Sequence, residues 1–517
     1  MNTNLKIVKA TFILVTASII GHLLSLGKEV IVAAKFGVTK EMDAFYAAIT
    51  LPNLFNIILL TTFSSVFIPV FVRYKLKEKE EANRVASIVI NYFSLFLLGS
   101  AILIFILAPS VITYGFHGLG IETRALAIRM LRIVCFILVF SGLIGAMTGI
   151  LNARQHFAWP AFSPIFVTLT TVVFILVFVK QWAIFVLAYG LLVGLIIQCL
   201  FLSAVTKERG YRHYLDFNWR HPAVKQILFL ALPYFIVITM AELNIVVDRV
   251  MASYLDPGSI AALGYAGKMA QVPLIVFSSS IGIAVFPFFA TQVAEDKTEE
   301  LKDTLGKSIR MIGFIFIPLT VILVILSRPL IQLLFQRGAF TSWATDLTSI
   351  IFICYSFQCF FYTAGMILAK VFLAFQDIAS LLKITIAGVI MNVILNLIFV
   401  RIIIPPAAGI ALSTSVVSCI TMFFAFLFLK RRPFYLKGKY ILQGISKVVI
   451  SSLFMGIGVF YIFRVFQKFV IFNSTLGQAL CLLILGSIGL IIFMGISFIL
   501  KLPEINKIWE LIYARFR

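Results

Sequence analysis

Charged residues are scarce in this chain of 517 residues. They make up only 12% of it, whereas hydrophobic residues make up 61%. Soluble globular proteins usually carry roughly a quarter charged and about half apolar residues. The composition therefore excludes a soluble globular protein and indicates that the chain lies in a lipid bilayer.

Pairs of cysteines with metal-ligand or redox spacing are also absent. No C-x-x-C pair occurs, and no cluster of histidines lies near any cysteine. The six cysteines all fall inside apolar runs: Cys135, Cys199, Cys354, Cys359, Cys419 and Cys481. We expect them to be small packing residues, without zinc or redox chemistry.

Long polar segments are missing too. No connection between apolar runs exceeds roughly 20 residues, which leaves no room for a soluble catalytic domain. The phosphate-binding pattern G-x-x-x-x-G-K does not occur. A membrane glycosyltransferase or polymerase needs paired carboxylates or a metal site in a sizeable outward loop. We therefore expect neither an enzyme nor a protein that hydrolyses ATP.

Fourteen apolar runs are present instead, and each is long enough to cross a bilayer as a helix of about 20 residues. They cover residues 10–35, 44–72, 85–108, 126–151, 160–180, 183–205, 225–251, 268–291, 305–327, 347–370, 381–401, 407–430, 443–463 and 475–500. This pattern predicts an all-α integral membrane protein with about fourteen transmembrane helices.

Basic residues concentrate in the short loops and give a formal net charge of +22. If the N-terminus is cytoplasmic, about 28 of the Lys and Arg residues face the cytoplasm and about 9 face outward. The cytoplasmic segments are then 73–84, 207–225, 297–310, 430–439 and the C-terminal tail. The charge thus reflects membrane topology, with both termini in the cytoplasm, and not binding to nucleic acid.

The two halves of the chain repeat each other. Pro52 and Pro69 recur as Pro273 and Pro287, and further landmarks keep an offset of about 217 to 221 residues. Six helices separate the copies, so both have the same orientation, with a substrate cavity expected between them. The repeat predicts an N-terminal lobe at 1–220, a C-terminal lobe at 221–436 and two extra helices at 437–517.

Ionisable residues inside the spans are candidates for function, because each costs a few kcal/mol to insert. His22, Lys28 and Glu29 lie in the first span, Arg249 in the seventh, and Lys268 opens the eighth. Together the basic groups can present positive charge to an anionic group between the lobes. The alternative for Lys28 and Glu29 is pairing with neighbours or snorkelling to an interface.

Asp43 begins the second span. A carboxylate near a helix N-terminus is favourable without any role in transport. Capping and a functional role are equally compatible with its position.

A second group of polar residues is not basic. Asn392 and Asn396 are four residues apart and share a helix face, Thr414 lies on the next helix, and Asp248 lies in the seventh. Their oxygens suit a hard cation. The alternative is hydrogen bonding between helices, worth about 1 kcal/mol for each contact.

Several motifs resemble those of the lipid II flippase family (MurJ/MviN) of the multidrug/oligosaccharidyl-lipid/polysaccharide (MOP) exporter superfamily. They are DAFY at 43–46, LPNL at 51–54, FSSVFIP at 63–69, ILN at 150–152, FAWPAF at 157–162, FQRGAFT at 335–341 and AFQD at 374–377. They run in order from the first helix to about residue 415.

The resemblance implies two six-helix lobes, two extra C-terminal helices and a cationic cavity for the pyrophosphate of an undecaprenyl-linked peptidoglycan precursor. Alternating access would then carry lipid II outward across the bacterial cytoplasmic membrane, in support of cell wall biogenesis and cell shape. By position, His22, Lys28 and Lys268 stand where the family usually has arginine, and Asp43 matches. With Arg249 and Glu29, they form the expected substrate site. The oligomeric state stays open.

The chain departs from the family at Asn56 and Ile57, where two arginines are usual. Lysine also binds phosphate as a point charge, without the planar fork of arginine. This departure favours an alternative cargo, another lipid-linked oligosaccharide such as an exopolysaccharide or O-antigen repeat unit.

The resemblance also implies a sodium site in some members. The corresponding positions here are Asp248, Asn392, Asn396, the carbonyl of Ile410, and Thr414. Asn396 stands where a second carboxylate occurs in some members, which lowers the charge of the site. Apart from sodium, no cofactor is expected.

Overall fold

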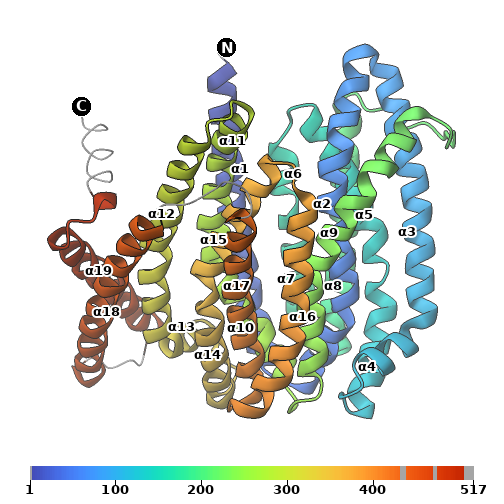
Figure 1. Cartoon of the computed structure of the whole chain (residues 1–517). Helices are drawn as coiled ribbons and strands as arrows, with labels where there is room; N and C mark the ends of the chain where they lie inside the picture. Colours follow the sequence, from blue (N-terminus) through green and yellow to red (C-terminus); the bar gives the residue numbers. More distant parts are fainter. Residues whose placement is uncertain (1–2, 431–437, 470–473, 506–517) are drawn as a thin grey trace. The chain divides into compact units, whose positions relative to one another are not determined.

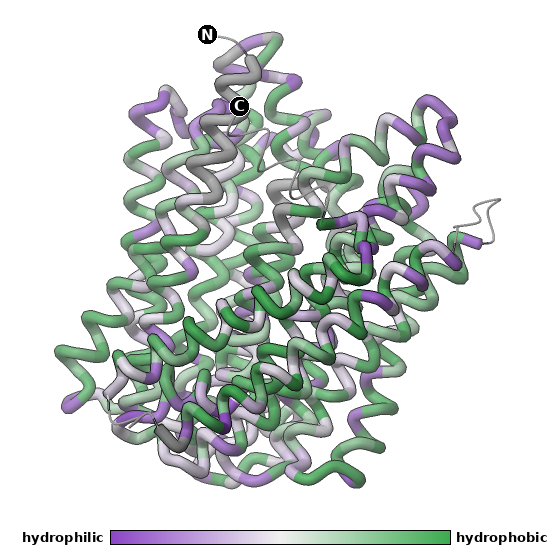
Figure 2. The backbone as a smooth tube through the Cα atoms, turned by 90° about the vertical axis from the view of Figure 1, so that its left-hand side faces the viewer, coloured by the Kyte–Doolittle hydropathy of each residue, from purple (hydrophilic) through white to green (hydrophobic). Residues whose placement is uncertain are grey.

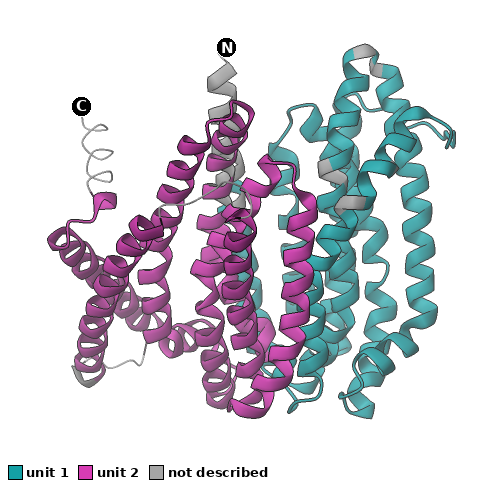
Figure 3. Ribbon diagram, in the orientation of Figure 1, with its two compact units in different colours: residues 1–261 teal, residues 262–517 magenta. Residues whose placement is uncertain are grey.

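The structure, a computed structural model, describes residues 3–430, 438–469 and 474–505, and every regular element in these ranges is a helix. Two compact units are found, residues 1–261 and 262–517 (Figure 3). The division places the whole seventh predicted span in the first unit. The lobe ends at 220 and 436 therefore stay predictions based on the repeat.

The first unit contains nine helices within the described residues (Figure 1). They are α1 (Thr3–Phe36), α2 (Lys40–Lys77), α3 (Lys79–Gly115), α4 (Ile121–Val134), α5 (Ile137–Ala153), α6 (Ala158–Phe162), α7 (Pro164–Trp182), α8 (Phe185–Glu208) and α9 (Pro222–Ala252). Near the α2–α3 turn, α2, α3, α5 and the start of α9 enclose an apolar core that includes Phe67 and Phe71.

The second unit begins within α10 (Ser259–Pro273) and is helical in its described part. Its further elements are the π-helical turn η1 (Leu274–Ser278), α11 (Ser279–Ala294), α12 (Thr298–Ile325), α13 (Ser327–Phe335), α14 (Ser342–Ser356), α15 (Gln358–Ala374), α16 (Ile378–Ile402), α17 (Pro406–Lys430), α18 (Gly438–Phe469) and α19 (Thr475–Ile499).

Thirteen helices, or pairs of consecutive helices, in the described residues are long and apolar enough to cross a membrane. They match the second to fourteenth predicted spans, and α1 covers the first. Figure 2 shows hydrophobic residues along the middle of the helices and hydrophilic residues near their ends. The fold is therefore the predicted all-α membrane bundle of about fourteen helices. Residues 431–437 and 506–517, expected in the cytoplasm, lie outside the described residues.

The eighth span differs from its predicted bounds. The helix begins at Ser259, whereas the apolar run was expected to begin at 268, because the intervening residues are mostly small and only weakly apolar. The π-helical turn follows Pro273 directly. Proline lacks an N–H and crowds the preceding turn, which favours such a local change in helix winding.

Helix breaks follow the predicted repeat. The fourth span is interrupted at Cys135 and Phe136, between α4 and α5, and the tenth at Phe357, between α14 and α15. These breaks lie at the offset that relates Pro52 to Pro273. Both copies therefore share an internal irregularity as well as a sequence pattern.

The two extra helices are attached to α12 by a buried ion pair. Arg310 donates from Nε and Nη2 to the two carboxylate oxygens of Glu504, at 2.7 and 3.1 Å. The Tyr440 ring stacks on the guanidinium, 4.2 Å from its carbon. Gly444 leaves the space for it, since a Cβ there would lie 2.5 Å from Arg310 Nε.

Candidate functional site

Tyr46 of α2 is the centre of a charged cluster in the first unit. Arg249 of α9 donates from Nη1 to the Tyr46 carbonyl at 3.3 Å and to Thr50 Oγ1 at 3.0 Å. Its guanidinium carbon also lies 5.5 Å from the centre of the Tyr46 ring. These contacts fix the guanidinium against α2, because its donors and its π face both have partners there.

Lys28 and Glu29 add a second pair of charges from α1. Lys28 Nζ lies 2.9 Å from Glu29 Oε1, with side-chain exposures of 23% and 5%. The charges of Glu29, Arg249 and Lys28 all act on the hydroxyl of Tyr46, so the α1 pair and the α9 arginine share one polar region. The pairing expected as an alternative for Lys28 and Glu29 is thus present, while the ammonium group keeps partial exposure.

Asp43 is buried beside this region, with its carboxylate bonded to backbone. Oδ1 accepts the N–H of Ala261 at 2.7 Å, and Oδ2 accepts the N–H of Gly258. Asp43 therefore caps the start of α10, while Thr39 caps its own helix by accepting the N–H of Met42. The carboxylate joins the beginning of α2 to the beginning of α10.

Gly258 allows the chain before α10 to pack closely against Val38. Its φ of +93° lies in the region that favours glycine, and a Cβ would come within 3.0 Å of the Val38 carbonyl oxygen. The turn before α10 thus packs directly on the turn before α2.

The two remaining residues of the predicted substrate site lie on α1 and α10. His22 is exposed on α1, nearly two turns before Lys28, and Lys268 is partly buried on α10 in the second unit. Their part in one shared cationic cavity stays a prediction.

The second unit contains the predicted polar group around α16 and α17. Asn392 and Asn396 are fully buried, and Asn396 Nδ2 donates to Asn392 Oδ1 at 3.2 Å. Ser413 donates to Asn396 Oδ1 and also, at 2.7 Å, to the carbonyl of Ile410. Thr414 donates to the same carbonyl at 3.2 Å. The bond from Ser413 to Asn396 joins α17 to α16, so hydrogen bonding between helices, the alternative to an ion site, is present.

The donor set of this group is also compatible with a hard monovalent cation. Two amide oxygens, one carbonyl and two hydroxyls gather here, and such neutral oxygens are ligands for hard cations. The expected carboxylate, Asp248, is buried on α9 in the first unit. The part of the predicted site in the second unit thus offers neutral oxygen ligands.

Sequence reasoning missed three uncharged residues of these clusters: Tyr46, Thr50 and Ser413. Tyr46 belongs to the DAFY motif and lies one turn before Thr50, which accepts from Arg249. Ser413 lies beside Thr414. Proximity in sequence to a charged or motif residue was the available signal, because none of the three is ionised at neutral pH.

Comparison with known proteins decides the family. The family model described as "Lipid II flippase MurJ" matches residues 32–479. The chain belongs to this family. A probable lipid II flippase MurJ of Synechocystis sp. is 28% identical over 98% of this chain and 97% of its own length. A lipid II flippase MurJ of Burkholderia cenocepacia is 25% identical over 81% of this chain and 83% of its own.

Solved structures agree with the MurJ family assignment. A lipid II flippase MurJ in an inward closed conformation matches with a TM-score of 0.80 and 26% identity, covering 95% of this chain and 98% of the other. An inward-facing MATE family transporter of the MOP superfamily matches with a TM-score of 0.68 and 16% identity over 80% of this chain and 94% of the other, which supports the fold alone. The MurJ family is one of transporters, and this member is a multi-pass inner-membrane protein.

Proposed function

We propose that this chain is a lipid II flippase, which moves the lipid-linked peptidoglycan precursor outward by alternating access. The observation that carries the proposal is the MurJ family match over residues 32–479, since it spans nearly all predicted helices. The buried charges around Tyr46 supply what a diphosphate needs. Enzymatic chemistry on the cargo is not part of the proposal.

Lys28, Arg249 and Lys268 hold the diphosphate in this account. Arg249 is preorganised by Thr50 and Tyr46, so its guanidinium needs little further ordering when an anion binds. Lys28 exchanges its partner Glu29 for a phosphate oxygen. His22 and Glu29 assist near Lys28, and Asp43 keeps the turn before α10 in place.

Membrane potential or a cation gradient resets the transport cycle. One elementary charge that crosses 100 mV gains about 2.3 kcal/mol. A sodium ion held by Asn392, Asn396, the Ile410 carbonyl and Thr414, with Asp248 as the counter-charge, would supply such a charge. The same ion would compete with the hydrogen bonds of Ser413 and Thr414.

Both termini are proposed to lie in the cytoplasm. Fourteen crossings return the chain to its starting side, and the basic segments 73–84, 207–225 and 297–310 all fall on that side. This orientation sends the proposed cargo from the cytoplasmic leaflet to the outer leaflet.

Asn56 and Ile57 favour a second candidate function, the transport of another lipid-linked oligosaccharide. The resemblance places two arginines at these positions, and their loss removes two bidentate phosphate ligands. An exopolysaccharide or O-antigen repeat unit on the same lipid carrier is then the alternative cargo.

Complementation tests this proposal. A bacterium is depleted of its own lipid II flippase and made to express this chain, or the variants Lys28→Ala and Lys268→Ala. Growth should be rescued by the native chain and lost in both variants, whereas Lys180→Ala, at a helix end, should rescue. Membrane expression without rescue by the native chain would favour the second cargo.

A further inference from the structure

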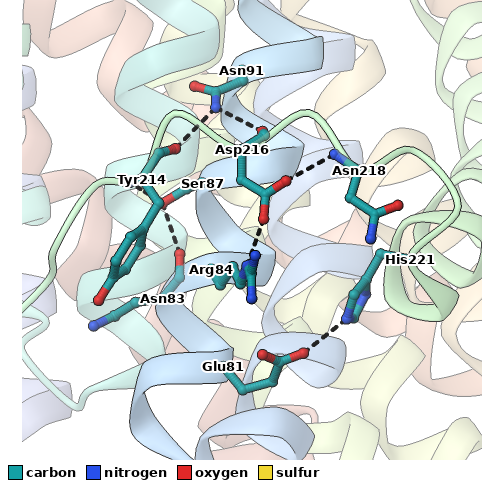
Figure 4. Close-up of polar contacts among 9 residues, drawn as sticks. All are labelled: Glu81, Asn83, Arg84, Ser87, Asn91, Tyr214, Asp216, Asn218 and His221. Atoms are coloured by element: carbon teal, nitrogen blue, oxygen red, sulfur yellow. Dashed lines mark hydrogen bonds and ion pairs between the residues drawn. The ribbon is translucent and has the colours of Figure 1, made fainter.

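The segment between α8 and α9, residues 209–221, is fastened across one face of α3 (Figure 4). Asn91 donates to the carbonyls of Tyr214 and Asp216, both at 3.0 Å, and Arg84 bonds the Asp216 carboxylate at 2.5 Å. Ser87 accepts the N–H of Tyr214 at 3.0 Å. The backbone of this connection is therefore held in one place by side chains of α3.

This segment exposes some of its side chains and covers others. Tyr214 and Asp216 are only partly exposed, and the Asp216 carboxylate faces Arg84 of α3. Leu215, Phe217 and Trp219 have exposures of 84%, 47% and 60%. Phe217 packs edge-on against Tyr92 of α3, with the ring centres 5.7 Å apart. All three large apolar side chains nevertheless keep an exposed surface.

The face of α3 that carries the segment continues as an apolar stripe. Arg84, Ser87 and Asn91 follow helical spacing, and the same face then bears exposed apolar residues from Leu95 onward. Those residues are Leu95, Leu98, Ile102, Phe105 and Ile106. In a membrane-spanning helix this stripe faces lipid tails. Asn91 precedes Leu95 by one turn, about 6 Å along the axis, so the segment lies at the level of the lipid headgroups.

Positive charge lies beside the apolar side chains. Arg212 and Arg220 are exposed, and the guanidinium of Arg220 lies 5.6 Å from the Trp219 ring. Tryptophan and arginine together are typical of the membrane interface, where the ring lies among headgroups and the cation attracts anionic lipid.

We propose that Leu215, Phe217, Trp219, Arg212 and Arg220, here called the loop patch, form a binding surface for anionic phospholipids. The apolar side chains enter the interface, and the two arginines bind lipid phosphates. The proposal rests on the membrane insertion of α3 and is independent of the cargo. Lipid bound at this connection between the two repeats then holds the start of α9 at a fixed depth in the membrane.

Fluorescence of Trp219 tests the loop patch. The full chain and its Trp219→Phe variant are reconstituted in vesicles of phosphatidylcholine, with and without phosphatidylglycerol. Subtracting the emission spectrum of the variant from that of the native chain gives the emission of Trp219. We expect blue-shifted emission, quenched more by lipids brominated close to the headgroup than by lipids brominated near the chain end. Phosphatidylglycerol should increase the quenching.

Charge variants separate lipid binding from simple proximity. The double variant Arg212→Gln, Arg220→Gln should lose the increase caused by phosphatidylglycerol, with lipid occupancy falling about fivefold for each arginine. The control Lys180→Gln, Arg401→Gln removes equal charge elsewhere and should keep the increase. Water-like emission that soluble iodide quenches equally in both kinds of vesicle would overturn the proposal and leave the patch as a surface for a protein partner. An unchanged phosphatidylglycerol response in the double variant would overturn the role of the arginines.

Discussion

Single residues of the expected substrate site have structural roles in this protein, and Asp43 is the clearest case. Its carboxylate accepts two backbone N–H groups at the start of α10, so it is occupied within the protein. The resemblance to the MurJ family assigned Asp43 to the substrate site. Its geometry shows the capping role, in which it positions the turn between α9 and α10.

Replacing Asp43 by asparagine should destabilise the protein by about 1 to 3 kcal/mol, because one buried backbone N–H loses its acceptor. Thermal unfolding in detergent measures this as a lower midpoint. Asp256→Asn is the matched control, since that side chain is exposed on the same turn. Equal midpoints for Asp43→Asn and the native chain would show that the capping bonds contribute nothing.

Charged residues of the site could be predicted from sequence, whereas their neutral partners could not. Lys28, Glu29 and Arg249 were identified because ionisable groups in apolar runs are costly. Tyr46 and Thr50 carry no such signal, since tyrosine and threonine also occur in ordinary membrane helices. Only the packing of α9 on α2 reveals that Arg249 is bonded there.

Among the elements, the segment 209–221 depends on a titratable ion pair. The hydrogen bond from Arg84 lowers the pKa of Asp216 below its ordinary value of 3.8. The pair therefore contributes fully above that value and is lost only as the pH falls through the lowered pKa. The segment should remain fastened to α3 at any physiological pH.

Asp216→Asn should release this segment at neutral pH. Amide hydrogen exchange of residues 209–221 should become roughly two- to fivefold faster, in keeping with the loss of an exposed ion pair. Asp303→Asn, which breaks the exposed pair with Lys307 on α12, is the control and should leave these amides unchanged. Native exchange rates in Asp216→Asn would mean that Asn91 and Ser87 fasten the segment alone.

The extra helices α18 and α19 depend on the buried pair of Arg310 and Glu504. Glu504→Ala leaves a guanidinium unpaired in an apolar setting and should cost about 3 kcal/mol, read as a lower unfolding midpoint. The double variant Arg310→Met, Glu504→Leu should recover most of this loss. Glu299→Ala, which breaks an exposed pair with Lys302, should change little. A double variant as unstable as the single one would contradict this account.

Helix ends lie within seven residues of the predicted spans, except at the start of α10. The start of α10 was expected nine residues too late, because the capping by Asp43 comes from a distant part of the sequence. The π-helical turn after Pro273 likewise depends on local backbone geometry that hydropathy does not register.

For the whole molecule, the repeat predicts a first lobe that ends at residue 220, whereas the first compact unit ends at residue 261. The difference arises because α9, the first helix of the second repeat, is bonded to α2 and α3 through Arg249, His221 and Glu81. The repeat reflects a pattern shared by the two halves of the sequence, whereas the compact units reflect contacts in the folded chain.

The central claim is that a cationic site moves lipid II between leaflets. Purified protein is reconstituted in vesicles that carry labelled lipid II on the inner leaflet, and a membrane-impermeant reagent detects its arrival outside. We expect transport by the native chain and by Lys180→Ala, with at least a tenfold loss in Lys28→Ala and Lys268→Ala, since each charge-assisted phosphate bond is worth about 1.5 to 3 kcal/mol. Equal transport by native chain and both lysine variants, or none by a folded native chain, would contradict it.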